Sequence, residues 1–338
     1  MTRVAIVGAT GYSGGELTAL LARHPRAEVV GLFGSGSGKA VPVAVHPTLR
    51  GRALPTVAPF SVDAALAASP DAVFLATPHE LSAEVARPLL EAGVKVIDLS
   101  GAFRLASGSD YERHYGFTHP APELLDEAVY GLTEWTDGAL EGARLVANPG
   151  CYPTTVLLAL KPVLDLLAAG APIVADAKSG VSGAGKKSDI AFSFSELSGN
   201  FKAYGVGKHR HEPEMRQRLG LHAGADFVFV PHLLPIVRGM LTTLHVSFSS
   251  PVSEEALVSR YAAAYGTAPF VNVRVPGELP ELAEVVNTPR CDIGFVVLPG
   301  GRRAVIVSAL DNLLKGAASQ AVQNFNRVFG FAEEEGLS

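Results

Sequence analysis

The stretch RVAIVGATGYSGGELTALL, residues 3–21, decides the fold of the first half of the chain. A short apolar run typical of a buried strand leads into a glycine-rich turn, and helical spacing begins at Glu16. Gly8, Gly11 and Gly14 give G-x-x-G-x-x-G, a variant of the dinucleotide fingerprint in which glycines allow a tight turn and a close approach to a pyrophosphate. The alternative is a purely structural glycine turn. The order strand, glycine turn, helix favours a Rossmann-type nucleotide-binding domain.

The end of the next predicted strand, residues 28–33, and the loop after it favour NADP over NAD as the cofactor. It ends without the Asp or Glu that would bind the ribose of NAD, and the loop that follows contains Ser35, Ser37 and Lys39. Hydroxyl groups, open backbone N–H groups and a lysine suit a 2′-phosphate. A flexible Gly/Ser loop is the competing interpretation.

Two further strand-and-helix units extend the predicted sheet. Their strands, 71–76 and 95–99, end in loops, and such loops at the carboxyl ends of parallel strands bind ligands in open α/β sheets. Arg104 lies in the second loop and is a candidate clamp for a phosphate or carboxylate, with a surface arginine as the alternative.

One of the two cysteines of the chain, Cys151, lies in NPGCYPT, residues 148–154. Pro149 and Gly150 stop the preceding apolar segment, and the run from Val156 to Leu167 has helical spacing. A helix N-terminus stabilises a thiolate and lowers the pKa below the value of about 8.5 for a free thiol. Cys151 is therefore a candidate nucleophile, and a small buried hydrophobe is the alternative.

The second half of the chain contains two further segments with candidate functional residues. Residues 178–187 combine glycines, serines and three lysines in a loop that suits an anion, or that is merely solvated. Residues 208–214 include His209 and His211, either of which could be the acid/base partner of the thiol. Their spacing alone does not show which of the two it is. A His-x-His metal site would need further ligands, so no metal is predicted.

The remaining pattern predicts an α+β domain with a mostly antiparallel sheet. Strand-like runs occupy 227–230 and 241–248, and two more, 295–298 and 304–308, form a predicted hairpin. A final helix begins at about Leu314.

The composition bounds the class of protein. A chain of 338 residues suggests two domains, and a net charge of −5 with no basic run argues against nucleic acid as a partner. The two cysteines lie far apart, which argues against a disulfide framework and a Cys-based zinc site. No apolar stretch reaches about 18 residues, so we expect a cytoplasmic protein without a membrane partner.

These motifs together resemble the N-acetyl-γ-glutamyl-phosphate reductase family of arginine biosynthesis, within the wider semialdehyde dehydrogenase group. The resemblance covers nearly the whole chain and adds the stretches 99–105, 178–185, 209–214, 232–235 with 238–240, and 311–317. Lys186 and Thr155 depart mildly from what we expect of that family. The resemblance implies an oxidoreductase that uses NADP(H) to reduce an acyl phosphate, through a thioester on the cysteine.

The resemblance also implies roles for individual residues. Cys151 would be the nucleophile, His209 the acid/base partner, and Glu214 would orient the site. The implied substrate-binding residues are Arg104, Asn148, Lys178 and His211. The implied cofactor-binding residues are Gly8, Thr10, Gly11, Tyr12, Ser13, Gly14, Ser35, Ser37, Lys39, Ser182, Gly183 and Asn312.

The resulting expectation has two domains: an NADP-binding domain of residues 1–148 plus 312–338, and a catalytic and oligomerisation domain of residues 149–311. We expect a small acyl-phosphate substrate and a homodimer or homotetramer. Two alternatives stay open beside this resemblance. One is the lysine-pathway enzyme that reduces an aminoadipyl phosphate held on a carrier protein. The other is an NADP sensor without catalysis.

Overall fold

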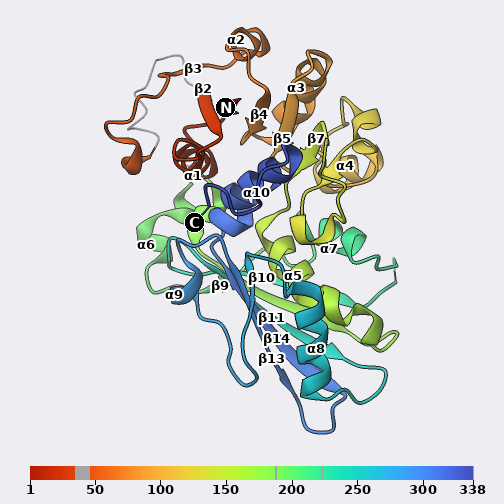
Figure 1. Cartoon of the computed structure of the whole chain (residues 1–338). Coiled ribbons are helices and arrows are strands. Elements are labelled where there is room, and N and C mark those ends of the chain that lie inside the picture. Colours follow the sequence, from red (N-terminus) through yellow and green to blue (C-terminus); the bar gives the residue numbers. More distant parts are fainter. Residues whose placement is uncertain (35–45, 187–188, 223, 338) are drawn as a thin grey trace. The chain divides into compact units, whose positions relative to one another are not determined.

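The computed structural model describes residues 1–34, 46–186, 189–222 and 224–337. The chain forms two compact units (Figure 1). The first unit is Met1–Gly150 with Ala317–Ser338, and the second is Cys151–Gly316. Within the described residues no helix is long and apolar enough to cross a membrane.

The first unit contains a parallel sheet with the strand order β3-β2-β1-β4-β5-β7-β6. The strands are β1 (Thr2–Val7), β2 (Ala27–Gly34), β3 (Val57–Pro59), β4 (Ala72–Leu75), β5 (Lys95–Asp98), β6 (Val129–Tyr130) and β7 (Leu145–Ala147). The helices are α1 (Tyr12–Leu21), α2 (Val62–Ala67), α3 (His79–Glu91), α4 (Gly108–His114) and α10 (Ser319–Val328).

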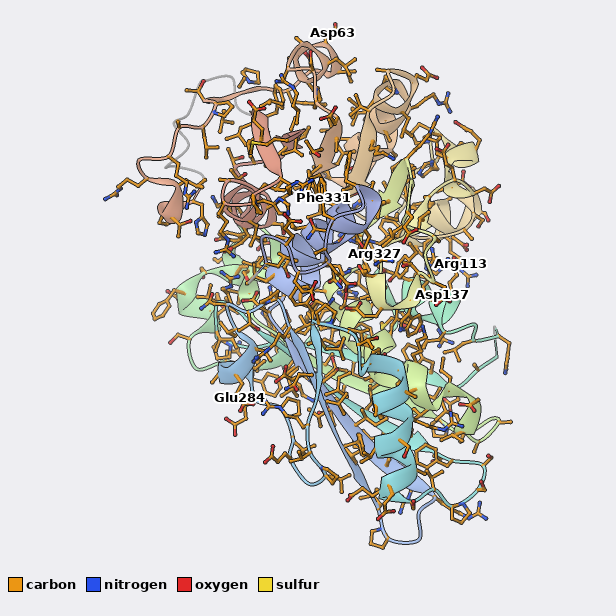
Figure 2. All side chains as sticks on the ribbon, in the orientation of Figure 1. Asp63, Arg113, Asp137, Glu284, Arg327 and Phe331 are labelled. Carbon is orange, nitrogen blue, oxygen red and sulfur yellow. The ribbon has the colours of Figure 1, made fainter. Side chains whose placement is uncertain are left out.

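Helices cover both faces of this sheet because successive strand residues point to opposite faces. Phe74 of β4 contacts Phe325 of α10, whereas its neighbours Val73 and Leu75 lie in a core that includes residues of α2 and α3. Figure 1 shows α10, from the end of the chain, beside α1, from its beginning. Phe331, labelled in Figure 2 just beyond α10, continues this aromatic packing. The predicted Rossmann-type domain is confirmed.

Helix α1 begins at Tyr12, four residues before the start predicted from hydrophobic spacing. Gly14 and Gly15 lie inside the helix and are buried. Glycine lowers helix propensity, so the sequence pattern favoured a turn there, but the missing side chains are what allows the helix to begin so close to the strand.

The second unit contains a mixed sheet with the strand order β12-β13-β14-β11-β8-β10-β9. The strands are β8 (Ile173–Ser179), β9 (Lys202–Ala203), β10 (Phe227–Leu233), β11 (Met240–Ser247), β12 (Val271–Val273), β13 (Cys291–Val297) and β14 (Arg303–Leu310). The helices are α5 (Cys151–Leu160), α6 (Phe194–Leu197), α7 (His211–Arg218), α8 (Glu254–Tyr265) and α9 (Leu282–Val285). Figure 2 shows Glu284 on α9.

Most pairings in this sheet are antiparallel, as predicted, including the β13–β14 hairpin. The exceptions are β8 with β10 and β12 with β13, which run parallel. Helix α5 covers one face, where the Ser308 hydroxyl donates to the Thr155 carbonyl at 3.0 Å. The opposite face leaves side chains such as Asp176 and Lys178 of β8 partly exposed.

The helices next to the two connections between the units have other lengths and types than the sequence predicted. Helix α5 ends at Leu160 and continues as a 3₁₀ helix, Lys161–Leu166, because Pro162 has no backbone N–H for an α-helical bond. Near the second connection, Leu314–Ala318 is a π-helical turn that precedes α10. The boundaries between the two compact units lie after Gly150 and after Gly316. The predicted boundaries between the NADP-binding and catalytic domains, at 148/149 and 311/312, stay a prediction.

Candidate active site

The glycine loop after β1 has the close contacts of a nucleotide-binding turn. Gly8 has φ +86°, and a Cβ there would lie 2.1 Å from the Ala76 carbonyl oxygen. A Cβ on Gly14 would lie 2.1 Å from the Gly8 carbonyl oxygen. Among the described residues no side chain caps the start of α1, and the first turn of this helix carries no acidic residue. The glycines are therefore required for this tight turn between β1 and α1.

At the carboxyl end of β5, a buried polar group organises the next loop. Asp98 is fully buried and accepts hydrogen bonds from the Ser100 amide at 3.0 Å and the Ser100 hydroxyl at 2.8 Å. Burial raises the pKa of Asp98. The structure places Arg104 in this loop, with its Nε donating to the Asn148 carbonyl at 2.8 Å and Nη2 donating to the Leu99 carbonyl at 2.8 Å.

Arg104 and Asn148, both predicted to bind substrate, therefore lie together within the first unit. The Asn148 side chain is 1% exposed, donates to the Ala317 carbonyl at 3.2 Å and accepts from the Asn324 amide at 3.0 Å. These partners hold the strand end that precedes Cys151. The sequence analysis did not include Asn324, which lies 176 residues away in the chain.

In the second unit, Cys151 is the first residue of α5 and its thiol is partly exposed. The first amides of the helix and its positive dipole end stabilise a thiolate at this position. The next residue, Tyr152, has its hydroxyl 3.1 Å from the hydroxyl of Tyr204. Burial, with the charge of Cys151 adding to it, raises the pKa of Tyr204 to about 12, and burial raises that of Tyr152 as well. Both phenols therefore stay protonated beside the thiol at neutral pH.

Two histidines contact the tyrosine that follows the cysteine. The Tyr152 ring centroid lies 5.4 Å from that of His209 and 5.9 Å from that of His211. The His209 ring also lies 5.6 Å from that of Tyr204. Burial, with the adjacent Arg210 adding to it, lowers the pKa of His209 to about 4. The structure thus brings His209, His211 and the residue next to Cys151 into one cluster, which sequence spacing could not establish.

Gly316 packs directly against the cysteine. A Cβ on Gly316 would lie 2.8 Å from the Cβ of Cys151 and 3.2 Å from a methyl group of Leu310. Gly316 lies within the π-helical segment Leu314–Ala318, and its amide donates to the Asp311 carbonyl at 3.0 Å. The glycine is required here for space, and the sequence analysis missed this role.

Three residues predicted to bind the cofactor, Ser182, Gly183 and Asn312, also lie together in the second unit. The Asn312 amide nitrogen donates to the Ser182 hydroxyl at 2.9 Å, and its oxygen accepts from the Gly239 amide at 2.8 Å. A Cβ on Gly183 would lie 3.7 Å from the Asn312 amide nitrogen. The loop after β8 is therefore joined to the segment after β14 by the Asn312 side chain.

Lys178 lies apart from this cluster. Its ammonium group pairs with Asp176 at 3.1 Å on the open face of the sheet, and Asp176 also contacts His232 at 3.1 Å. The next residue, Ser179, is buried on the opposite face, where its hydroxyl donates to the Gly180 carbonyl at 3.0 Å. Glu214 is fully buried on α7.

Some predicted residues lie outside what can be placed. Ser35, Ser37 and Lys39 fall outside the described residues. Within the described residues, no group of three or more histidine, cysteine or carboxylate side chains could hold a metal ion. Tyr152 and Tyr204 were not predicted as site residues. The signal for Tyr152 was its position next to Cys151, but only the fold brings Tyr204 to it.

Comparisons with known proteins extend over the whole chain. Residues 3–143 match the semialdehyde dehydrogenase NAD-binding domain, and residues 151–312 match the semialdehyde dehydrogenase dimerisation domain. The chain is 48% identical over 343 residues to an N-acetyl-gamma-glutamyl-phosphate reductase of Halorhodospira halophila, covering 100% of this chain and 98% of that protein. It is 46% identical to a reductase of the same name from Symbiobacterium thermophilum, covering 99% and 97% of the two chains.

A solved structure shares the fold at much lower identity. Aspartate semialdehyde dehydrogenase II of Vibrio cholerae superposes with a TM-score of 0.71 over 97% of this chain and 98% of its own, at 18% identity. That similarity concerns the fold alone, whereas the two domain matches and the full-length relatives concern the family. The chain belongs to the semialdehyde dehydrogenase family and, within it, to the N-acetyl-γ-glutamyl-phosphate reductases.

Proposed function

We propose that this protein catalyses the NADPH-dependent reductive dephosphorylation of N-acetyl-γ-glutamyl phosphate to N-acetyl-L-glutamate 5-semialdehyde in arginine biosynthesis. The observation that carries the proposal is the full-length relationship to reductases of that name. The partly exposed Cys151 at the start of α5 supplies the group that this chemistry needs. We assign the reaction to the cytoplasm.

Cys151 is the proposed nucleophile. Its thiolate attacks the acyl carbon of the acyl phosphate, the carbon–oxygen bond to phosphate breaks, and a thioester forms on the sulfur. The amides at the start of α5 are candidates to stabilise negative charge on the carbonyl oxygen, an effect worth about 3 kcal/mol per donor in other enzymes. His209, as the acid/base partner, and Glu214, which would orient the site, complete the proposed catalytic set.

The glycine loop after β1 fits NADP(H). The predicted contacts in this loop are Gly8, Thr10, Gly11, Tyr12, Ser13 and Gly14, and the tight turn that Gly8 and Gly14 allow is typical of a loop that binds a pyrophosphate with its backbone amides. When bound, NADPH supplies the hydride that reduces the thioester carbonyl. Ser182, Gly183 and Asn312 of the second unit stay predicted cofactor contacts, as do the three residues outside the described part of the chain.

For the substrate, we propose Arg104, Asn148, His211 and Lys178. The first two lie together at the strand ends of the first unit, and His211 lies next to His209. Lys178 is the weakest member of this set because its charge is paired with Asp176 on the open face of the sheet. Its substitution should therefore affect substrate binding less than substitution of Arg104.

The chain carries a dimerisation domain, so it forms an oligomer. We propose a homodimer or homotetramer in which the open face of the second sheet, on the side of Asp176 and Lys178, lies at a subunit contact. Side chains on that face alternate with the buried ones that α5 covers.

The reverse reaction tests the proposed function. Purified protein should reduce NADP when given N-acetyl-L-glutamate 5-semialdehyde and inorganic phosphate, with no reduction when phosphate is omitted. Formation of NADPH is followed by its absorbance. If folded protein that binds NADPH gives no turnover with this substrate but turns over a carrier-linked aminoadipate semialdehyde, the assignment to arginine biosynthesis is wrong.

Substitution of Gly316 should impair catalysis without unfolding the protein. In Gly316→Ala the new methyl group would lie 2.8 Å from the Cβ of Cys151, so one of the two must shift. A displacement of the nucleophile of about 1 Å lowers kcat roughly tenfold to a hundredfold. Gly108→Ala is the control, because a Cβ there finds only Pro122 at 3.7 Å. An unchanged kcat in Gly316→Ala would show that the cysteine does not depend on this contact.

A further inference from the structure

Two buried side chains hold the Arg104 loop, residues 100–105, from the segment that follows it. The hydroxyl of Tyr111, on α4, accepts a hydrogen bond from the Leu105 amide at 3.1 Å. His119, beyond α4, is bonded through Nε2 to the Ala102 carbonyl at 2.9 Å. The backbone is therefore held on both sides of the arginine.

The hydrogen bonds of His119 define the protonation of its ring. A carbonyl oxygen only accepts, so Nε2 carries a proton and donates it to Ala102. Nδ1 accepts the Ala121 amide at 3.2 Å and so presents a lone pair. His119 is 4% exposed, and burial lowers its pKa. The ring is therefore a neutral donor with both nitrogens bonded to backbone, which suits it to hold the loop and not to transfer a proton.

The rings of Tyr111 and His119 pack together in the core of the first unit. Their centroids lie 4.8 Å apart, and the Phe103 ring lies 5.4 Å from that of His119. Tyr111 is fully buried, and burial raises its pKa, so it remains a phenol. Because close-packed side chains resist displacement, the two hydrogen bonds hold the loop in one position.

The end of β5 holds the start of the same loop. The Ser100 hydroxyl donates to the buried Asp98 carboxylate at 2.8 Å and accepts from the Ala102 amide at 3.1 Å. Ala102 is consequently bonded through both of its backbone groups, the amide to Ser100 and the carbonyl to His119.

The fixed backbone sets the position of the Arg104 guanidinium. Its Nε and Nη2 donate to the carbonyls of Asn148 and Leu99 at 2.8 Å each, and the residue is 6% exposed. The guanidinium is planar with its N–H groups in a fixed fork, so these bonds define the direction in which the fork meets an anion. A binding group has to be held within about 0.5 Å by the residues behind it, and a shift of the loop backbone would move the fork.

We propose that Tyr111 and His119 are positioning residues that hold Arg104 for an anionic group of the acyl-phosphate substrate. The proposal rests on the proposed function, because it takes Arg104 as a substrate-binding residue. Tyr111 and His119 act through the arginine and not by contact with the substrate. The phosphate and the carboxylate of the substrate share the chemistry that an arginine fork recognises, and separate KM values distinguish them.

Arg104→Lys identifies the kinetic constant that depends on the arginine. Lysine keeps the charge but loses the fork. In the reverse reaction we expect one KM to rise about tenfold to a hundredfold. It will be the KM for phosphate if the fork holds phosphate, and the KM for N-acetyl-L-glutamate 5-semialdehyde if the fork holds the carboxylate. The KM for NADP should stay unchanged.

Substitutions of the two positioning residues should change that same constant. His119→Asn keeps an acceptor near Nδ1 for the Ala121 amide but has no donor at Nε2, and Tyr111→Phe removes the acceptor of the Leu105 amide. Each should raise the KM identified by Arg104→Lys about threefold to tenfold, with kcat within about twofold of wild type. His119→Gln places a donor near Nε2 and should restore most of the wild-type KM.

His24 provides the matched control for His119. It is 3% exposed in the same unit, its Nδ1 accepts the Arg26 amide at 3.1 Å, and its Nε2 is bonded to the Asn326 Oδ1 at 2.9 Å. These partners lie between α1 and β2 and on α10. His24→Asn should lower the Tm, as His119→Asn does, but leave all three KM values unchanged.

Tyr111→Phe in the Arg104→Lys background completes the test. If the tyrosine acts through the arginine, its loss should change the KM by less than about twofold once the fork is gone. The proposal is overturned if the Tyr111 and His119 variants leave this KM unchanged, raise the KM for NADP equally, or add their full effect to that of Arg104→Lys. Folded Arg104→Lys with wild-type KM values would overturn it as well. Failure of the proposed function would appear differently, as wild-type protein without phosphate-dependent turnover.

Discussion

Cys151→Ser is expected to abolish the phosphate-dependent reduction of NADP, with a fall in kcat on the order of 10⁴- to 10⁶-fold. The substitution exchanges one atom at the first residue of α5 and leaves the helix and its neighbours in place. A hydroxyl group is not ionised near neutral pH, so the start of the helix has no anion to stabilise and the acyl carbon meets a weak nucleophile. NADP binding and the circular dichroism spectrum should be unchanged.

The other cysteine provides the control for this substitution. Cys291 is fully buried on β13, so Cys291→Ser tests the loss of a thiol outside the cluster. It should retain kcat while losing some stability. Iodoacetamide should add one label to the wild-type protein and none to Cys151→Ser under native conditions. If Cys151→Ser keeps more than a few per cent of the wild-type turnover while it no longer reacts with iodoacetamide, the thioester route is excluded.

Local sequence was sufficient to predict the parts of this protein whose geometry depends on neighbouring residues. Position 8 requires a positive φ and position 14 has no space for a Cβ, so both positions require glycine. The two glycines therefore appear in the sequence at a fixed and recognisable spacing. The start of α5 at Cys151 was predictable for the same reason, because Pro149 and Gly150 interrupt the preceding strand.

Contacts between distant segments could not be predicted from a comparable sequence pattern. The hydroxyl of Tyr204 meets that of Tyr152 across 52 residues, and the pair exists only because β9 and β10 bring the loop before α7 to the start of α5. Lys178 was predicted from its glycine-rich surroundings to face an anion. Strand β8 continues one residue beyond it, and its ammonium group pairs with Asp176 on the partly exposed face of the sheet. The end of a strand decides such an orientation, and strand ends are the least predictable feature of a sequence.

Asp311 illustrates a residue whose importance emerges only from its partners. It is fully buried, and Arg238 donates to it through two nitrogens, at 2.9 and 3.2 Å. The amides of Asn287 and Leu313 donate to its two oxygens at 2.8 Å each. The carboxylate therefore joins three segments of the second unit at the turn that carries Gly316 to the cysteine.

Asp311→Ala is expected to lower the free energy of unfolding of the second unit by about 3–5 kcal/mol, because it leaves the Arg238 guanidinium without its buried partner and several amides without an acceptor. The matched control is Asp165→Ala. Asp165 also binds an arginine, Arg260, through two nitrogens, but it is 66% exposed, so its loss should cost no more than about 1 kcal/mol. Urea unfolding should be followed by circular dichroism, since the only tryptophan, Trp135, lies in the first unit and its fluorescence would not follow the second. Equal losses in the two variants would mean that burial does not distinguish the pairs, and that the turn at Asp311 is held by its backbone contacts alone.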